Sequence, residues 1–290
     1  MKNLIIFTVL YAQVFYRKLT AGRRTLPQFY ILGAPKCGTT ALYELLRQHP
    51  NFVSSFLEIK ELSYLQEVPN FNPFPFIIHK VFGRYSGINS YRKFFPLKSK
   101  MASISKRTGA SAVSGDCTPI YMYCPVAAKR VKALTPEAKL IIMIRNPISR
   151  TYSEYNMFRE KKIEQRTFEQ AIEDELKNIS LSHFIRETYI QRSIYEPYIK
   201  MYYDLFDKKQ IMVIKSEDFF SNTENVVKKV LEFIGLPQET FSVNYNTTPR
   251  NEGASTLPMK AETKNLLKNY FRPHNKNLCN LLGVDLNWDH

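Results

Sequence analysis

Residues 33–40 read Gly33-Ala34-Pro35-Lys36-Cys37-Gly38-Thr39-Thr40, and this stretch decides the fold. It follows an apolar run at 28–32 that has the aromatic and β-branched residues of a buried strand. Directly after it, apolar residues recur at helical spacing, at Ala41, Leu42, Leu45 and Leu46. A strand, a glycine loop and a helix N-terminus in this order favour a bound phosphate, because they bring backbone N–H groups and the positive end of a helix dipole together. We expect Thr39 or Thr40 to supply the N-cap oxygen.

The lysine of this loop is not where a nucleotide-hydrolysing P-loop has it. The pattern G-x-x-x-x-G-K-[ST] places lysine directly after the second glycine, where it reaches the β- and γ-phosphates. Here Thr39 holds that position, and the lysine is Lys36, inside the loop. The displacement indicates an anionic ligand whose reacting group differs from the γ-phosphate of ATP. The alternative is a plain strand-to-helix turn, but such a turn requires neither a lysine nor two threonines.

Composition limits the class of protein and its partners. With 290 residues, 44% hydrophobic and 23% charged, the chain is ordinary for one large globular domain or at most two smaller ones. The formal net charge of +15 favours anionic partners, which include nucleotides, acidic polysaccharides, nucleic acid and anionic membranes. We predict no nucleic-acid role, because no recognition motif or clustered basic helix stands out.

The N-terminus and the cysteines leave alternatives open. We expect residues 1–27 to form an apolar segment with a basic stem, and residues 28–290 to form a single domain. The apolar stretch from Leu4 to Tyr16 is shorter than the roughly twenty residues of a membrane span, so it predicts a weak signal anchor, a signal peptide or an amphipathic helix. Cys117 and Cys124 are either bridged or free thiols. No cysteine spacing indicates a metal, and we expect none.

Strand patterns alternate with helical patterns along the chain, which favours a parallel sheet covered by helices. The sequence therefore predicts an α/β, P-loop-like three-layer fold with a central parallel sheet flanked by helices. Strands are expected at 28–32, 110–115, 139–144 and 210–215, and helices from 222 to 234 and, briefly, from Lys60-Glu61. Residues 69–105 show no sustained period and are interpreted as a long insertion over the site.

Three segments resemble, in the expected order, the sulfotransferases that use 3′-phosphoadenosine 5′-phosphosulfate (PAPS). Residues 33–42 are similar to the loop that holds the 5′-phosphosulfate. Residues 141–155 are similar to the segment that holds the 3′-phosphate, with an arginine and a serine eight residues apart at Arg145 and Ser153. Residues 270–289 resemble the C-terminal end of the Golgi heparan sulfate sulfotransferases, to which the chain is most similar together with their bacterial and algal relatives.

The resemblance implies PAPS as the sulfuryl donor, no metal, and a set of site residues. Lys36 would stabilise the departing phosphate, and Glu61 would act as general base. Strand 139–144 ends in an arginine, where a nucleotide hydrolase has a magnesium-binding aspartate. The predicted cofactor-binding residues are Lys36, Cys37, Gly38, Thr39, Thr40, Arg145, Ser153, Arg250 and Gly253. The predicted substrate-binding residues are Lys60, Asp116 and Thr118.

Two departures from the heparan pattern leave the acceptor open. Cys117 stands where the heparan enzymes commonly have a lysine, and Pro249-Arg250-Asn251-Glu252-Gly253-Ala254 replaces their Lys-Gly-Arg-like run. We expect transfer to a hydroxyl or amine of an acidic or neutral glycan, in the Golgi lumen with an N-terminal membrane anchor, or in the cytoplasm if the chain is bacterial. The alternatives are an inactive polyanion-binding protein on the same fold and a P-loop kinase.

Overall fold

The sheet lies at the centre of the computed structural model, which describes residues 2–58, 60–66, 85–177, 188–238 and 258–288. In this part of the chain it has the strand order β2-β1-β3-β4, and every neighbouring pair is parallel. The strands are β1 Phe29–Gly33, β2 Gly115–Cys117, β3 Lys139–Ile144 and β4 Ile211–Lys215. The predicted α/β fold with a parallel sheet flanked by helices is confirmed.

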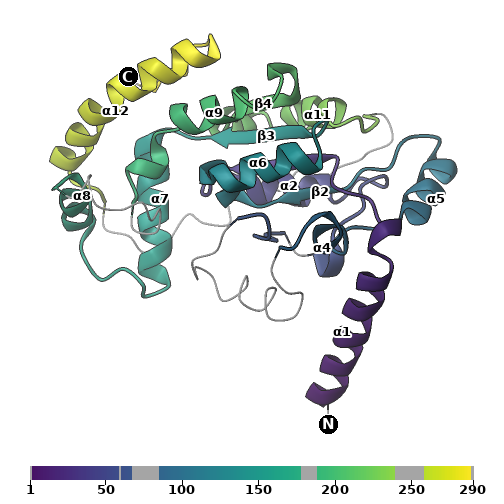
Figure 1. The fold of residues 1–290 in the computed structure, drawn as a ribbon. Helices are drawn as coiled ribbons and strands as arrows, with labels where there is room; N and C mark the ends of the chain where they lie inside the picture. The colour runs from purple at the N-terminus through teal and green to yellow at the C-terminus, as the bar shows by residue number, and fades with distance from the viewer. Residues whose placement is uncertain (1, 59, 67–84, 178–187, 239–257, 289–290) are drawn as a thin grey trace.

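Helices cover both faces of this sheet (Figure 1). The chain moves from β1 outward to β2 and then returns past β1 to β3 and β4, so right-handed crossovers put α2 on one face and α6 and α9 on the other. In agreement, α2 packs against α11, and α6 packs against α9. The helices are α1 Lys2–Leu19, α2 Thr39–Leu46, α4 Ile88–Arg92, α5 Lys98–Thr108, α6 Pro125–Leu134, α7 Pro147–Glu160, α8 Phe168–Lys177, α9 Glu196–Tyr203, α10 Ser216–Ser221, α11 Thr223–Phe233 and α12 Ala261–Leu282.

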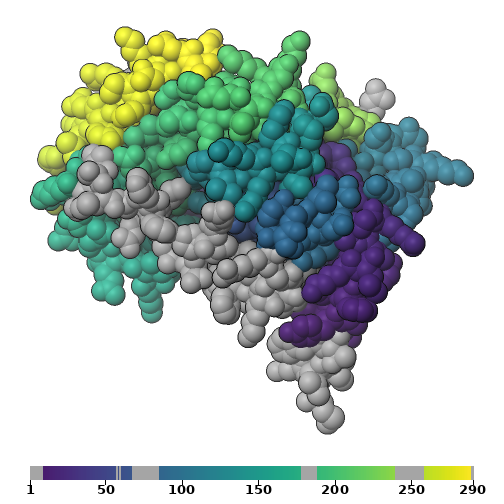
Figure 2. Space-filling model, viewed as in Figure 1, coloured from purple at the N-terminus to yellow at the C-terminus, as the bar shows by residue number. Residues whose placement is uncertain are grey.

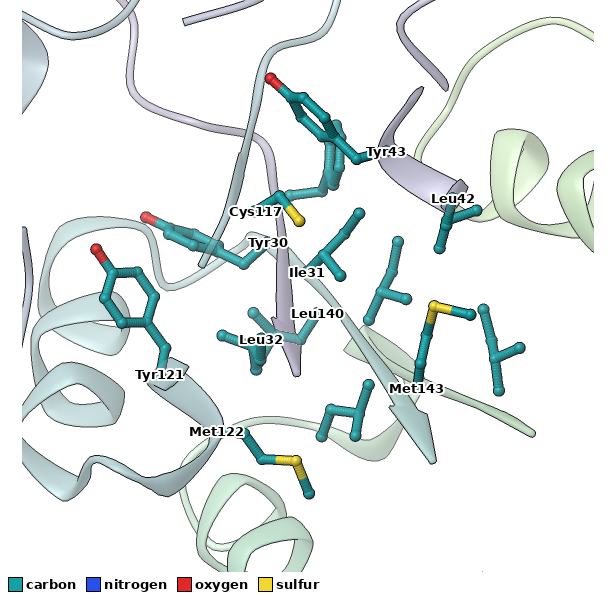
Figure 3. Packing of buried hydrophobic residues seen from close by; sticks show 14 of the residues in the cluster. Tyr30, Ile31, Leu32, Leu42, Tyr43, Cys117, Tyr121, Met122, Leu140 and Met143 are labelled. Carbon is teal, nitrogen blue, oxygen red and sulfur yellow. The ribbon is translucent and has the colours of Figure 1, made fainter. Parts of the chain in front are cut away.

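The core is built on β1 and β3. All five residues of β1 and the last five of β3 are buried, as expected for parallel strands covered on both faces. Figure 3 shows the β1 side chains packed between residues of β3 and of the segment after β2. Packing at β2 is equally tight: a β-carbon at Gly115 would lie 2.3 Å from the Phe29 ring. The strand that leads into the phosphate loop is therefore fixed from all sides.

Several local predictions hold and others are wrong. Strand 139–144 and the helix near 222–234 are confirmed. Lys60-Glu61 does not begin a helix, because residues 60–66 are bends and extended chain. The insertion at 69–105 contains α4 and the start of α5, and residues 67–84 lie outside the described residues. The N-cap of α2 is Gly38 rather than a threonine, since a left-handed backbone there turns the chain into the helix.

The N-terminal segment forms helix α1, and its C-terminal end packs on the domain. No helix within the described residues combines the length and apolarity that crossing a bilayer requires. The thiols of Cys117 and Cys124 are free in this structure.

Candidate functional site

The candidate site is the loop between β1 and α2, at the edge where the parallel strands end. The strand order reverses between β1 and β3, and open α/β sheets bind ligands in the crevice at such a point. The end of β3 lies beside β1 and the end of β4 lies next to β3, so the segments that follow both strands reach the edge where the loop lies.

Three consecutive carbonyl groups of this loop accept hydrogen bonds from three different elements. Pro35 O accepts from Arg150 Nε of α7 at 3.3 Å. Lys36 O accepts from Nη1 of Arg145, just after β3, at 3.4 Å, and Cys37 O accepts from Ser216 Oγ of α10 at 2.6 Å. We call this set the carbonyl clamp. The clamp holds the loop through the carbonyl oxygens of the loop, so the backbone N–H groups of the loop stay available to a ligand.

The donors lie at the start of α2. Among the described residues, the N–H groups of Gly38, Thr39 and Thr40 donate to no backbone carbonyl. The first N–H groups of a helix lack intrahelical partners and sit at the positive end of its dipole. Gly38 has φ 90°, a left-handed backbone that favours glycine, and a β-carbon there would lie 3.1 Å from the Phe220 ring, so a larger residue would also have to displace that ring. The geometry fits a phosphate-sized anion.

Lys36 is the half-buried cation of the loop. Its backbone is left-handed, with φ 70°, and the clamp holds the carbonyls on both sides of it. Within the described residues, Nζ has no hydrogen bond or ion pair. Burial lowers the pKa of Lys36, and the carboxylates of Glu154 and Glu160 partly oppose this shift. A dianion at the loop would supply the missing counter-charge.

Arg150, which donates to Pro35 O in the carbonyl clamp, also belongs to a buried ionic network. Arg150 is fully buried, donates from Nη1 to Tyr189 O at 3.0 Å, and pairs through Nη2 with Glu154. Glu154 also pairs with Arg192, whose Nε has no partner in the described part of the chain. Burial alone would lower the pKa of Arg150, but the Glu154 carboxylate raises it overall. Two guanidinium groups share one carboxylate, so an excess positive charge lies behind the loop.

Arg145 and Ser153, predicted to hold a second phosphate, both lie near the loop's edge of the sheet. The backbone of Arg145 is fixed by Tyr195, whose hydroxyl donates to Arg145 O at 2.8 Å. Asn146 caps α7, because its Oδ1 accepts from the N–H groups of Ile148 and Ser149. Ser153 lies half-buried on α7. Their roles in binding stay predictions.

Lys60 connects the predicted base to the loop. Its Nζ donates to Thr40 Oγ1 and lies 3.3 Å from Glu61 Oε1. The Glu61 side chain is 46% exposed. Its carboxylate is therefore near the N-terminus of α2 and open to a ligand from solvent. The contact of Lys60 with substrate remains a prediction.

The segment that carries Glu61 is attached through buried side chains after β2. Tyr121 OH accepts from the N–H groups of Tyr64 and Leu65 at 2.9 and 3.1 Å, and Thr118 Oγ1 accepts from Ser63 N at 3.4 Å. These hydrogen bonds reach Ser63, Tyr64 and Leu65 rather than Glu61 itself, in contrast to the clamp, which acts directly on the loop.

Asp116 and Thr118, predicted to bind substrate, are buried in the interior of the structure. Asp116 Oδ1 accepts from Thr118 Oγ1 at 2.7 Å, and Oδ2 accepts from Tyr91 OH at 2.6 Å. Burial raises the pKa of Asp116 to about 6, although these hydrogen bonds lower it. Both side chains serve the protein's own network here, and direct contact with a substrate stays a prediction.

The structure thus gathers Lys36, Cys37, Gly38, Thr39, Thr40, Arg145, Lys60 and Glu61 around one loop. The Cys37 thiol is buried, and burial raises its pKa to about 11, so this residue takes part through its backbone. Arg250 and Gly253 lie outside the described residues. Sequence reasoning missed Arg150 and Ser216. The place of Ser216, directly after a strand, was a readable signal, because parallel strands end at the same edge.

Comparison with known proteins gives concordant matches. The profile of a family described as "Sulfotransferase domain" matches residues 26–265. Carbohydrate sulfotransferase 15 of Mus musculus is 26% identical over 306 residues, which cover 89% of this chain and 54% of that protein. Heparan sulfate glucosamine 3-O-sulfotransferase 3B1 of Mus musculus is 24% identical, over 93% of this chain and 66% of that protein. The chain therefore spans about half the length of the carbohydrate sulfotransferase 15 relatives it matches.

A solved structure shares the fold. The sulfotransferase from Alicyclobacillus acidocaldarius superposes with a TM-score of 0.68 at 24% identity, covering 92% of this chain and all of that one.

Proposed function

Because the chain belongs to the sulfotransferase domain family, we propose that it transfers a sulfuryl group from PAPS to a carbohydrate. The observation that carries the proposal is the carbonyl clamp around Lys36, which leaves in one loop, among the described residues, a lysine without an ion pair and N–H groups without carbonyl partners. A carbohydrate acceptor is supported by the similarity to proteins named as carbohydrate and heparan sulfate sulfotransferases.

The loop fits the 5′-phosphosulfate end of the donor. Bound there, PAPS supplies a sulfuryl group on a phosphate leaving group. The N–H groups of Gly38, Thr39 and Thr40 would bind the phosphate oxygens, and Lys36 Nζ would neutralise the charge that develops on the bridging oxygen. The excess positive charge of Arg150 and Arg192 over Glu154 favours the same anion.

The second phosphate is assigned to residues beyond the loop. Arg145 at the end of β3 offers a planar set of donors and Ser153 offers a hydroxyl, which together suit the 3′-phosphate. Arg145 also donates to Lys36 O, so one side chain would connect the two phosphate sites. Arg250 and Gly253 are proposed to close over the nucleotide.

Glu61 is the proposed general base. In the transfer, the bond between sulfur and the donor's bridging oxygen breaks while a bond from sulfur to the acceptor oxygen or nitrogen forms. The acceptor proton passes to Glu61, and Lys36 stabilises the leaving phosphate. Lys60, paired with Glu61 and bonded to Thr40, would keep the base beside the loop.

The location of the protein and its membrane anchor stay predictions, as does the absence of a metal. A second function, anion binding without transfer, is favoured by the net charge of +15. A P-loop kinase is disfavoured, because Thr39 holds the P-loop lysine position and Arg145 that of a magnesium aspartate.

The test is an incubation of purified protein with ³⁵S-labelled PAPS and a panel of glycans that includes heparan and chondroitin chains. Transfer of label to a glycan, lost in Lys36→Met, is the expected result. If calorimetry detects no PAPS binding while heparin still binds, the polyanion-binding function is correct instead.

A further inference from the structure

Helix α1 presents two different faces. The inner face packs on the domain: Val14 is 3% exposed, and Leu10 packs against the core. Arg17 fixes this end of the helix, because Nε donates to Lys93 O at 2.6 Å and Nη2 donates to Phe95 O at 3.0 Å. Its guanidinium also lies 4.3 Å from the centre of the Phe56 ring. The helix is therefore attached to the domain through one side.

The opposite face is apolar and exposed. Val9, Tyr11, Phe15, Tyr16 and Leu19 are between 51% and 70% exposed. At 100° per residue these five lie on one half of the helix, away from Leu10 and Val14. The other large exposed apolar residues of the described chain occur singly on separate elements, at Ile88, Ile163, Phe220, Leu266 and Val284. A helix that faces water normally has polar residues on that side, so this face indicates a partner.

Two segments at and beside this helix carry only basic charges. Residues 1–43 and 85–115 contain no aspartate or glutamate. Lys18 and Arg23 are exposed near the end of α1, and α5 exposes Lys98, Lys100, Lys106 and Arg107. An antiparallel bridge between Arg24 and Leu97 ties the start of α5 to the segment after α1. Figures 1 and 2 show α1 projecting from the body, with α5 near its attached end.

We propose that α1 and the basic residues of α5 form a docking surface for an anionic membrane, with α1 lying in the bilayer interface. An apolar helix face with basic residues beside it matches the chemistry of an anionic lipid surface. Tyr11 and Tyr16 suit the headgroup level, where tyrosine is enriched. Such attachment differs from a membrane span and does not depend on the sulfuryl transfer proposed above. Binding to an acidic protein would also need the basic residues of this surface, but it would not need a bilayer.

Vesicle co-sedimentation of the full chain tests the proposal. Vesicles of phosphatidylcholine with about one third phosphatidylserine should bind the protein, and pure phosphatidylcholine should bind at least about tenfold less. Each lysine lost from the surface should lower vesicle affinity about fivefold. The double variant Lys98→Glu with Lys100→Glu should therefore bind at least about twentyfold more weakly than the wild type. The matched control is Lys264→Glu with Lys276→Glu on α12, which should weaken binding less, because these lysines are exposed elsewhere.

The apolar face is tested by Phe15→Ser with Leu19→Ser, against the exposed control Ile163→Ser. The pair should lower vesicle affinity at least about tenfold, and the control should leave it unchanged. A Phe15→Trp variant should show blue-shifted emission with anionic vesicles and quenching by shallow rather than deep lipid-attached quenchers. Equal binding to both lipid compositions, no binding to either, or deep quenching would overturn the proposal.

Discussion

The two sides of the candidate site are built in opposite ways. On the donor side, the loop at 34–38 is held by side chains from α7, the end of β3 and α10, above a fully buried Arg150–Glu154 pair. On the acceptor side, Glu61 is about half exposed, and its segment is attached by hydrogen bonds to Tyr121 and Thr118. The donor side is preorganised, whereas the acceptor side leaves room for substrate to define its geometry. Changes on the donor side should therefore affect folding and chemistry together, whereas a change at the exposed Glu61 should affect chemistry alone.

The donor-side substitution with the largest expected effect is Lys36→Met, which removes the charge but keeps a non-glycine side chain at φ 70°. We expect kcat to fall about 1,000-fold, because the leaving phosphate loses its counter-charge. Affinity for the product nucleotide, 3′-phosphoadenosine 5′-phosphate, should change less than about tenfold. Steady-state kinetics and calorimetry measure the two effects. An exposed lysine changed in the same way, Lys264→Met, should retain full activity.

On the acceptor side, Glu61→Gln should lower kcat about 100-fold while KM for PAPS stays unchanged, because only proton transfer is affected. The free energy of unfolding should move by less than about 0.5 kcal/mol, since the side chain is exposed. The matched control is Glu58→Gln, three residues earlier, where the carboxylate pairs with Arg47. Equal losses of activity in both variants would remove Glu61 from the mechanism.

Arg145→Ala tests the connection between the two phosphate sites. Affinity for 3′-phosphoadenosine 5′-phosphate should fall about 10- to 100-fold, as the 3′-phosphate and Lys36 O both lose a donor. Affinity for adenosine 5′-phosphosulfate, which lacks the 3′-phosphate, should fall less. Calorimetry with both ligands gives the ratio, and Arg23→Ala is the exposed control. An equal loss for both ligands would mean that Arg145 does not contact the 3′-phosphate.

Arg150→Met should destabilise the protein by about 3–5 kcal/mol, because it removes one partner of a buried ion pair. Chemical denaturation measures this change. Glu154→Met should be more destabilised than Arg150→Met, since it leaves two buried guanidinium groups without a carboxylate, whereas Glu154 keeps Arg192 in the Arg150→Met variant. If the Arg150→Met variant were as stable as the wild type, the buried Arg150–Glu154 pair would not support the donor side.

The last prediction concerns the pH dependence of stability and the buried Asp116 of β2, and it involves no loss of activity. Burial raises the pKa of Asp116 from its usual value near 4 to about 6. A raised folded pKa means that the folded state holds this proton more tightly, so the contribution of Asp116 to stability is fully present below pH 4 and is lost as pH rises through 6. Asn cannot titrate, so in the Asp116→Asn variant the free energy of unfolding should fall by roughly 2–3 kcal/mol less than in the wild type over this pH range. Thermal or denaturant unfolding at several pH values measures the difference. Asp204→Asn, an exposed control, should leave the pH profile unchanged.

The sequence predicted the parallel sheet well because buried parallel strands are continuous apolar runs, as at 139–144. It located the loop because Gly33, Lys36 and Gly38 follow one such strand. Arg150 was missed because its hydrogen bonds to Pro35 and Tyr189 join segments 115 and 39 residues apart, and its local pairing with Glu154 does not by itself indicate a site. Lys60-Glu61 was wrongly assigned to a helix, since buried Tyr121 and Thr118 hold that segment extended.

We propose that the loop at 33–40 holds the 5′-phosphate of the donor against Lys36. A crystal structure of the wild-type protein with 3′-phosphoadenosine 5′-phosphate tests it most directly. The account predicts the 5′-phosphate within hydrogen-bonding distance of Lys36 Nζ and of the N–H groups of Gly38, Thr39 and Thr40, with the 3′-phosphate at Arg145 and Ser153. A nucleotide bound away from this loop, or a 5′-phosphate that does not contact Lys36, would contradict it.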